Sequence, residues 1–504
     1  MSDLQPTHLT PSSEHASHVQ AMRSSADDHV GQSNADEQND AGSSAFGKSN
    51  SDEESTAHEW IVERVTGKRT FRRWRDIRVQ GTLPLALSAR IPLEVFEFIV
   101  DEMDRPTLVA AALVCAAWYP RAMHNLYHPL EIRSRRSFNM LFKQIRASPR
   151  VEGWLASTCQ LVVNEDLKDD HFPSIDVYDN GLRFLQALPL ALTGLMPRLR
   201  ILRISHARLC FIPTYFFLAL SRFESVKSLT LFECRLNSIT QLRRIVSAFP
   251  RLTDLTMSVH FTQHAASYAG ASLFRPPSHI RLRYLNVHVH DESMVTFLDW
   301  MMHSGLCTSL AELTFISTNF SSTARAPINN LLEAVGGSLT RFCEIYLRVN
   351  YTVVPTNMSR NTALRSWKSW LNRIGHEAEH PWLKHRTAWA RATDELRDLF
   401  STIRSHQLEH IEFTVDVQFQ YFDQEGPSVV LEELDLRDLH EVMSQPYFDT
   451  LKHVEVKTWL HLVPPRNFLH SDEESIGRKV VAMFRDILQP WSARGIVNVT
   501  WARG

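Results

Sequence analysis

The sequence has few glycines and no long apolar run, and each of these features argues against particular classes of protein function. Only 17 of the 504 residues are glycine, which is few for an enzyme built on glycine-rich binding loops. No G-x-G-x-x-G marks a dinucleotide site, and no G-x-S-x-G marks a hydrolase nucleophile. The longest apolar run, residues 108–119, has twelve residues, whereas a helix needs about 20 to cross a bilayer. We therefore expect no membrane partner.

Cysteine is also scarce, and nothing at the amino terminus suggests secretion. The six cysteines lie far apart and form no C-x-x-C pair, which favours reduced thiols in a core over a disulfide framework. The first 20 residues carry neither a basic start nor an apolar stretch, unlike a signal peptide. We therefore expect a cytoplasmic or nuclear protein.

Overall charge is nearly balanced, but its distribution is not. The 54 basic and 56 acidic side chains give a net charge of −2, which excludes a generally basic nucleic-acid coat, so no nucleic-acid partner is expected. Residues 1–58 hold ten acids against two bases, a balance of −8, with little apolar surface. Such composition predicts a disordered acidic tail.

A basic linker is predicted next, over residues 59–84. The seven bases between positions 59 and 80 face only three acids; they are Arg64, Lys68, Arg69, Arg72, Arg73, Arg75 and Arg78. A stretch of this kind suits a nuclear-import signal or an anionic contact, and it equally suits a solvated linker or short amphipathic helix.

Residues 85–132 predict a compact helical unit. Pro92 suits a first helical turn, and apolar residues follow at helical spacing up to Met103. After a break at Asp104-Arg105-Pro106, residues 108–118 are rich in alanine and almost entirely apolar. This unit has more apolar surface than it can cover by itself, so it must pack on the rest of the chain or on a partner.

Beyond residue 195 an apolar triplet recurs, with its members three and then two places apart. Its first members are 27, 26, 30, 28, 32, 66 and 43 residues apart, and helical patterns lie between them. The eight triplets are Leu199/Leu202/Ile204, Val226/Leu229/Leu231, Leu252/Leu255/Met257, Leu282/Leu285/Val287, Leu310/Leu313/Phe315, Phe342/Ile345/Leu347, Leu408/Ile411/Phe413 and Leu451/Val454/Val456. The early spacings approach the roughly 20 to 29 residues of leucine-rich repeats, which alternate a strand with a helix.

We therefore predict an α/β fold in which residues 133–504 form an irregular leucine-rich-repeat-like solenoid of parallel strands alternating with helices. The 66-residue gap requires an insertion. Leu364, Trp367, Leu371 and Ile374 share one helical face, and Trp389, Leu396, Phe400 and Ile403 share another. This pattern predicts a helical hairpin over about residues 361–404.

One string suggests catalysis. His376-Glu377-Ala378-Glu379-His380 has the H-E-x-x-H spacing of a zinc hydrolase. Pro381 follows at once and biases His380 away from helical geometry, so a charged turn is the favoured interpretation and the zinc hydrolase a remote alternative. We expect no catalytic residue, metal ligand or cofactor.

Residues 91–131 resemble an F-box of the fungal type. Ile91-Pro92-Leu93-Glu94 resembles the L-P-x-E start of that motif, residues 113–118 resemble its V-C-K-x-W core, and residues 125–130 its aromatic close. The resemblance implies docking on a Skp-type adaptor of a cullin ubiquitin ligase. The expected adaptor-binding residues are Ile91, Pro92, Leu93, Val95, Phe96, Ile99, Leu113, Val114, Cys115 and Trp118.

Side chains that alternate with the core residues of each strand should line the other face of the sheet. Among them the candidate substrate-binding residues are Arg203, Phe232, Tyr284, His288, Tyr346 and Arg348, and Glu344 is expected on the same face.

The leading hypothesis is a non-catalytic substrate-recognition subunit of a Skp-cullin-F-box ubiquitin ligase. Its partners would be the adaptor, the cullin ligase and an unknown protein substrate. The alternative is a leucine-rich-repeat interaction scaffold without a role in ubiquitin conjugation. A separate structural interpretation of the helical unit is that it caps the open end of the solenoid, as a terminal repeat does.

Overall fold

The computed structural model describes residues 91–165, 184–262, 280–289, 291–317, 322–346, 356–374, 385–419, 434–462 and 470–503. These residues belong to one compact unit, Leu83–Gly504. The predicted acidic tail (1–58), the basic linker (59–84) and the string from His376 to His380 lie outside them. None of the described helices is long and apolar enough to cross a membrane.

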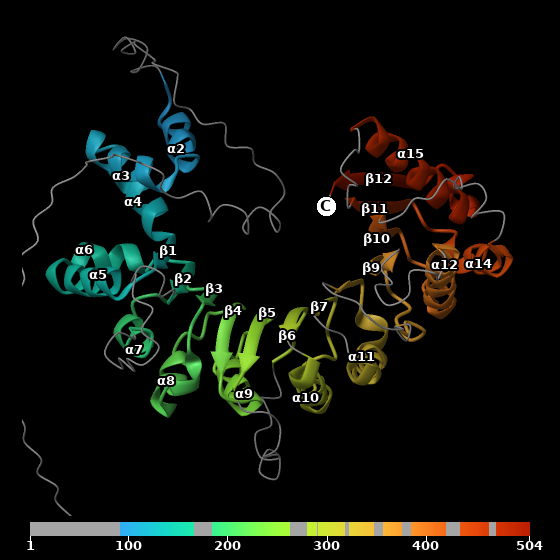
Figure 1. The fold of residues 1–504 in the computed structure, drawn as a ribbon. Helices are drawn as coiled ribbons and strands as arrows, with labels where there is room; N and C mark the ends of the chain where they lie inside the picture. The colour runs from blue at the N-terminus through green and yellow to red at the C-terminus, as the bar shows by residue number, and fades with distance from the viewer. Residues whose placement is uncertain are drawn as a thin grey trace, which may run out of the picture. The chain divides into compact units, whose positions relative to one another are not determined.

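A parallel sheet of twelve strands organises this unit, and its strands follow one another in chain order (Figure 1). The strands are β1 (Pro129–Ile132), β2 (Gln160–Asn164), β3 (Ile201–Ser205), β4 (Ser228–Leu236), β5 (Asp254–Phe261), β6 (Tyr284–Val289), β7 (Glu312–Ser317), β8 (Arg341–Tyr346), β9 (Ser366–Ile374), β10 (His410–Phe419), β11 (His453–Leu462) and β12 (Val497–Arg503). Strand, helix and parallel strand in unbroken succession are the arrangement of a leucine-rich-repeat-like solenoid, so the predicted fold class is confirmed.

Helices cover one face of the sheet, and we call the opposite face the open face (Figure 1). The helices of the repeats are α5 (Arg135–Ala147), α6 (Pro149–Leu155), α7 (Leu188–Leu192), α8 (Thr214–Leu220), α9 (Ile239–Ser247), α10 (Asp291–Ser304), α11 (Ser322–Val335), α12 (His385–Thr402), α14 (Arg437–Met443), α15 (His470–Ile487) and α16 (Gln489–Ser492). Buried apolar side chains of these helices, such as Phe216, Leu242 and Leu331, share one core with the inner side chains of the strands.

Nine stacked anchor residues hold the repeats together. Each precedes its strand, and each is at most 2% exposed. The anchors are Leu199, Val226, Leu252, Leu282, Leu310, Leu339, Leu364, Leu408 and Leu451. Full burial of one such side chain contributes about 1.5 to 3 kcal/mol. Burial of the nine anchors therefore contributes much of the free energy that holds neighbouring strands parallel and in register.

A serine or threonine just before an anchor often bonds the previous repeat. The Ser225 hydroxyl donates to the Leu199 carbonyl at 2.7 Å, and Ser309 donates to the Leu282 carbonyl at 3.1 Å. Later repeats show the same contact, from Ser338 to the Leu310 carbonyl and from Thr450 to the Leu408 carbonyl. This position thus has a structural role in some repeats, at the edge where the strands begin.

The predicted helical hairpin is wrong in its first half. Residues 366–374 form β9, which pairs with β8 and β10, whereas the second half is helical as α12. Trp367, Ser369 and Leu371 are buried on one side of β9. Ser369 stands where the third apolar member of the triplet that begins Leu364/Trp367 would be, so the strand spacing is hidden, while Leu364, Trp367 and Leu371 still fit a helical face.

The prediction for Glu344 is also wrong. Glu344 is 1% exposed and lies on the helix-covered side of β8, because the anchor of this repeat is Leu339 and its triplet begins three residues before the predicted Phe342. The Glu344 carboxylate accepts hydrogen bonds from Arg325 at 2.5 Å and from Thr356 at 2.7 Å. A buried ion pair therefore occupies the place where other repeats carry an apolar side chain.

Candidate protein-interaction surfaces

Three short helices precede the sheet: α2 (Leu93–Asp101), α3 (Arg105–Val114) and α4 (Tyr119–Tyr127). Pro92 stands just before α2 and leaves no backbone donor unsatisfied there. Asp104 begins α3 by accepting a hydrogen bond from the Thr107 backbone N–H at 3.0 Å. The predicted helical unit thus forms from the two patterns that the sequence contains.

This helical unit has only a small core of its own. Its buried members are Val100, Leu108, Ala111 and Ala122, which are separate from the large core of the repeats. Phe96 and Trp118 pack against each other at its border, with ring centroids 5.7 Å apart. A core of four buried residues leaves most apolar side chains of α2 and α3 without a place in the interior.

Polar contacts fix the geometry of the unit. Arg121 on α4 donates to the Asp101 carboxylate at the end of α2 at 2.6 Å and 2.5 Å, and Asn125 adds a bond of 2.8 Å. The hydrogen bond from Arg121 lowers the pKa of Asp101 to about 2. At neutral pH this fork holds α2 against α4.

Apolar side chains gather on the outside of α2 and α3. Of the thirteen large apolar side chains that are exposed among the described residues, seven lie in these two helices. Their exposed fractions are 52% for Leu93, 45% for Val95, 66% for Phe98, 44% for Ile99, 52% for Val109, 83% for Leu113 and 64% for Val114. We call these seven residues the apolar docking face. Such concentration on one small unit marks an interaction surface.

The ten predicted adaptor-binding residues all lie at the surface of this unit. Pro92, Leu93, Val95, Ile99, Leu113, Val114 and Cys115 are exposed. Ile91, Phe96 and Trp118 are half-buried. None is enclosed by the solenoid. Sequence reasoning missed Phe98 and Val109, whose spacing from the motif positions gives no separate signal.

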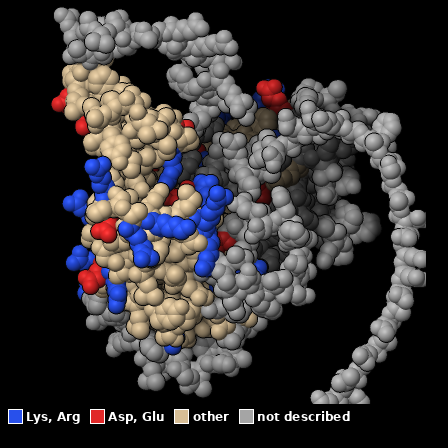
Figure 2. Space-filling model, turned by 90° about the vertical axis from the view of Figure 1, so that its left-hand side faces the viewer, with Lys and Arg blue, Asp and Glu red and all other residues tan. Residues whose placement is uncertain are grey.

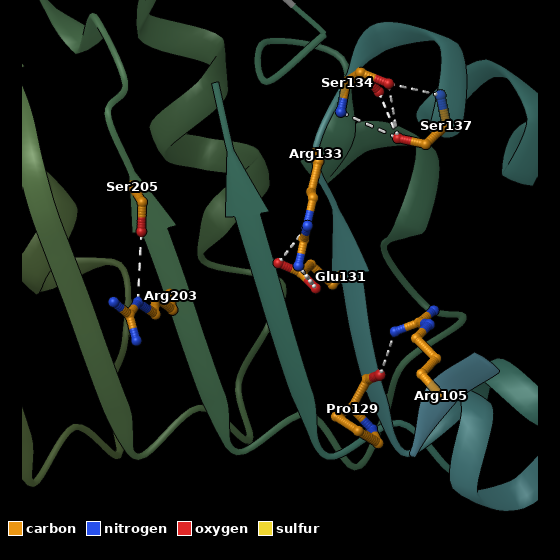
Figure 3. A network of polar contacts seen from close by, with 8 residues as sticks. All are labelled: Arg105, Pro129, Glu131, Arg133, Ser134, Ser137, Arg203 and Ser205. Carbon is orange, nitrogen blue, oxygen red and sulfur yellow. Dashed lines mark hydrogen bonds and ion pairs between the residues drawn. The ribbon is translucent and has the colours of Figure 1, made fainter. Parts of the chain in front are cut away.

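The helical unit joins the sheet through α4 and the first strand. The Thr158 hydroxyl donates to the Tyr127 carbonyl at 2.8 Å, and Arg105 donates to the Pro129 carbonyl at 3.4 Å (Figure 3). Beyond β1, Ser134 and Ser137 form a reciprocal capping box at the start of α5 (Figure 3). The chain therefore passes from the docking unit into the first repeat without a free linker.

Figure 2 looks onto this end of the molecule. The helical unit is largely free of charged side chains on this side, and Lys and Arg side chains gather beside it, over α5 and α6. The basic residues of this stretch are Arg133, Arg135, Arg136, Lys143, Arg146 and Arg150. Arg133 forms an ion pair with Glu131 at 2.8 Å (Figure 3). Positive charge therefore lies beside the helical unit on this side of the molecule.

On the open face, β3 and β4 bring two candidate residues together. The Arg203 guanidinium lies 5.6 Å from the centre of the Phe232 ring, and its Nε donates to Ser205 at 3.4 Å (Figure 3). His206 directly follows β3, and Glu233 lies at an irregularity in β4; both have positive φ (55° and 50°). His206 Nδ1 lies 2.9 Å from Glu233 Oε2, and this polar contact helps to hold the strained backbone.

The other substrate candidates are spread along the sheet. The Tyr284 hydroxyl accepts a hydrogen bond from Asn286 at 3.4 Å, and His288 Nδ1 lies 3.1 Å from the Ser258 hydroxyl. Tyr346 is the last residue of β8, and its side chain is outside the described part of the chain, as is all of Arg348. The structure thus unites Arg203 with Phe232 but keeps Tyr284 and His288 two strands further on.

A charged ladder crosses β9, β10 and β11. Glu412 Oε1 accepts from Lys368 at 2.8 Å and from Lys457 at 2.7 Å. Burial opposes ionisation of Glu412, but the two lysine hydrogen bonds outweigh it and lower its pKa. Oxygen and nitrogen atoms of His410, Glu412 and Glu455 lie within 4.8 Å of one another. Because two ammonium groups already neutralise Glu412, this cluster is organised as an ion-pair network.

Comparisons with known proteins identify no family for this chain. No family model and no curated protein matches the sequence. A solved structure described as the Rad7 and Elc1 complex in yeast contains a chain to which this one is similar, at 9% identity and a TM-score of 0.31. The match covers 75% of this chain and 91% of that chain. Function is therefore inferred from this chain's own residues.

Proposed function

We propose that this chain is a non-catalytic substrate-recognition subunit of a Skp-cullin-F-box ubiquitin ligase. The helical unit docks on a Skp-type adaptor, and the repeats bind a protein substrate. The apolar docking face is the observation that carries this proposal. It coincides with the stretch whose motifs resemble an F-box, although the docking face was located by exposure alone.

The number of exposed apolar side chains on the docking face is enough to support a stable complex. Burying a half-exposed leucine, valine or phenylalanine contributes about 1 kcal/mol, and seven such side chains lie on α2 and α3. The Asp101–Arg121 ion pair holds α2 against α4, and the small core packs α2, α3 and α4 together before binding. Less ordering is then required on association, which favours affinity.

The repeats supply recognition rather than chemistry in this proposal. Polar and aromatic side chains such as Arg203, Phe232 and Tyr284 give the open face the mixed character of a protein-binding surface. A substrate held there gains a high effective concentration next to the ligase that the adaptor recruits. No acid or base of this chain is needed for ubiquitin transfer.

Adaptor binding tests the proposal directly. Purified chain carrying Leu113→Glu and Val114→Glu should lose binding to a purified Skp-type adaptor, because both side chains are exposed and two charges would be buried at the interface. The matched control is Leu218→Glu, an equally exposed apolar residue (69%) on α8.

We expect the control to bind like the wild type and the double variant to lose more than about a hundredfold in affinity, which corresponds to about 2.7 kcal/mol. Absence of binding by the wild type would sink the proposal and leave the repeat scaffold as the surviving alternative. Equal affinity of the double variant and the wild type would place any contact elsewhere.

A further inference from the structure

A row of basic side chains follows one edge of the sheet, where β3, β4, β5 and β6 begin. In each of these repeats the residues just before and just after the anchor lie at this edge. Six of these eight positions are Arg or Lys, and none is acidic. The six are Arg198, Arg200, Lys227, Arg251, Arg281 and Arg283, and we call them the basic rim.

The row is continuous in space because the backbone forms a ladder there. The Lys227 N–H donates to the Arg200 carbonyl at 2.8 Å, the Thr253 N–H to the Lys227 carbonyl at 2.9 Å, and the Arg283 N–H to the Thr253 carbonyl at 2.7 Å. Neighbouring strands lie about 4.8 Å apart, so the rim extends over about 14 Å.

Contacts within the folded chain do not explain why these six positions are basic. All six side chains are exposed, and none makes a hydrogen bond or an ion pair with another described residue. Arg198, Arg251 and Arg281 stand where other repeats place a serine or threonine that bonds the neighbouring carbonyl. In the five repeats that follow, the ten equivalent positions hold only two bases and one acid. The charge is therefore concentrated in one part of the edge.

A shallow pocket of about 380 Å³ opens within the rim. Lys227 and Arg283 line it together with Asp254, Tyr284 and Glu312. Asp254 lies between Lys227 and Arg283, and Glu312 lies on β7 just beyond Arg283, so these two carboxylates would repel a continuous phosphate backbone. A polypeptide can instead set separate acidic side chains against the bases and place an amide or hydroxyl beside Asp254. Mixed lining of this kind favours a peptide over a nucleic acid.

We propose that the basic rim binds an acidic segment of the protein substrate, a segment that presents two or more carboxylates or phosphates. This inference rests on the proposed function, since it names the class of substrate that the repeats would take. An extended chain rises about 3.3 Å per residue, so four to five residues match the length of about 14 Å. Tyr284, already a candidate from the sequence, lines the pocket at the β6 end of this contact.

The test uses labelled peptides and the full chain. The probes are a short peptide of alternating Glu and Ser, the same peptide with phosphoserine, a Lys-Ser peptide, and a single-stranded DNA of matching negative charge. Binding is measured by fluorescence anisotropy at low and high salt. We expect one or both acidic peptides to bind with salt-sensitive affinity, more tightly than the DNA, and the lysine peptide not to bind.

Variants locate the contact. Arg283→Ala should weaken acidic peptide binding, whereas Arg365→Ala should not, because Arg365 is exposed at the same position of a repeat outside the rim. The triple variant Arg198→Ala, Arg281→Ala and Arg283→Ala should lose about tenfold or more in affinity. An unchanged unfolding midpoint checks that these exposed substitutions leave the fold intact.

Failure of this inference is distinguishable from failure of the adaptor proposal. The triple variant should still bind the Skp-type adaptor, and Leu113→Glu with Val114→Glu should still bind the peptide. The rim proposal is overturned if neither acidic peptide binds the wild type, if Arg283→Ala and Arg365→Ala weaken binding equally, or if the DNA binds more tightly than both peptides.

Discussion

The buried Arg325–Glu344 pair makes a sharp prediction about stability. Arg325 and Glu344 are 4% and 1% exposed, and their charged atoms are 2.5 Å apart. Thr356, fully buried, bonds the same carboxylate. Arg325→Met removes the positive partner and leaves the carboxylate in the interior. We expect a loss of about 3 to 5 kcal/mol in the free energy of unfolding, the usual cost of an uncompensated buried charge.

Adding Glu344→Leu to Arg325→Met should restore most of that loss. Glu344 lies at the third position of its triplet, where other repeats carry Leu231, Met257 and Phe315. Leucine therefore fits the site, and well-packed apolar replacements of buried pairs are often neutral or stabilising. Urea unfolding followed by circular dichroism measures the two variants. The reasoning would be refuted if Arg325→Met lowered the free energy of unfolding by less than about 1 kcal/mol, or if the double variant were less stable than Arg325→Met alone.

Two further predictions concern other contacts. The pKa of Asp101 is about 2 in the folded chain because of its hydrogen bond with Arg121. The stabilisation from this contact is present above the ordinary pKa of 3.8 and is lost as the pH falls toward 2. The difference in unfolding free energy between the wild type and Asp101→Asn, under about 1 kcal/mol for so exposed a pair, should therefore disappear over that range in unfolding measured as a function of pH. Gly477→Ala would make its new Cβ clash with the Trp501 ring, so thermal unfolding should show a loss of about 1 to 3 kcal/mol in the free energy of unfolding. An unchanged midpoint would mean that β12 can shift to make room for the methyl group.

The sequence predicts the repeats because their anchors are large and apolar. Seven of the twelve strands carry a triplet in the predicted register, β8 overlaps a triplet predicted in a shifted register, and the helices between them lie where the helical patterns do. Strand β9 was not predicted because the polar residue Ser369 occupies a buried strand position. The placement of Glu344 failed for a related reason: a charged residue inside the core shifts the apparent register, and its partner Arg325 is distant in sequence.

The candidate surfaces differ in how far the sequence predicts them. The helical unit could be predicted from local motifs, because short helices are specified by nearby residues; the ten candidate residues lie at its surface, and their binding to an adaptor stays a prediction. Contact between Arg203 and Phe232 depends on the pairing of β3 with β4, which fixes residues of separate repeats side by side. The basic rim was visible as Arg-Leu-Arg at 198–200 and 281–283. Only stacking of the repeats shows that these bases form one row.

Hydrogen–deuterium exchange of the full chain, with and without a Skp-type adaptor, tests the central claim most directly. Apolar side chains of α2 and α3 should become buried on binding, so the adaptor should slow exchange of backbone amides in residues 93–118. Amides of the central strands β4 to β7 should exchange at unchanged rates. Protection confined to the sheet, or no protection at a saturating adaptor concentration, would contradict the assignment of this face as the adaptor-docking site.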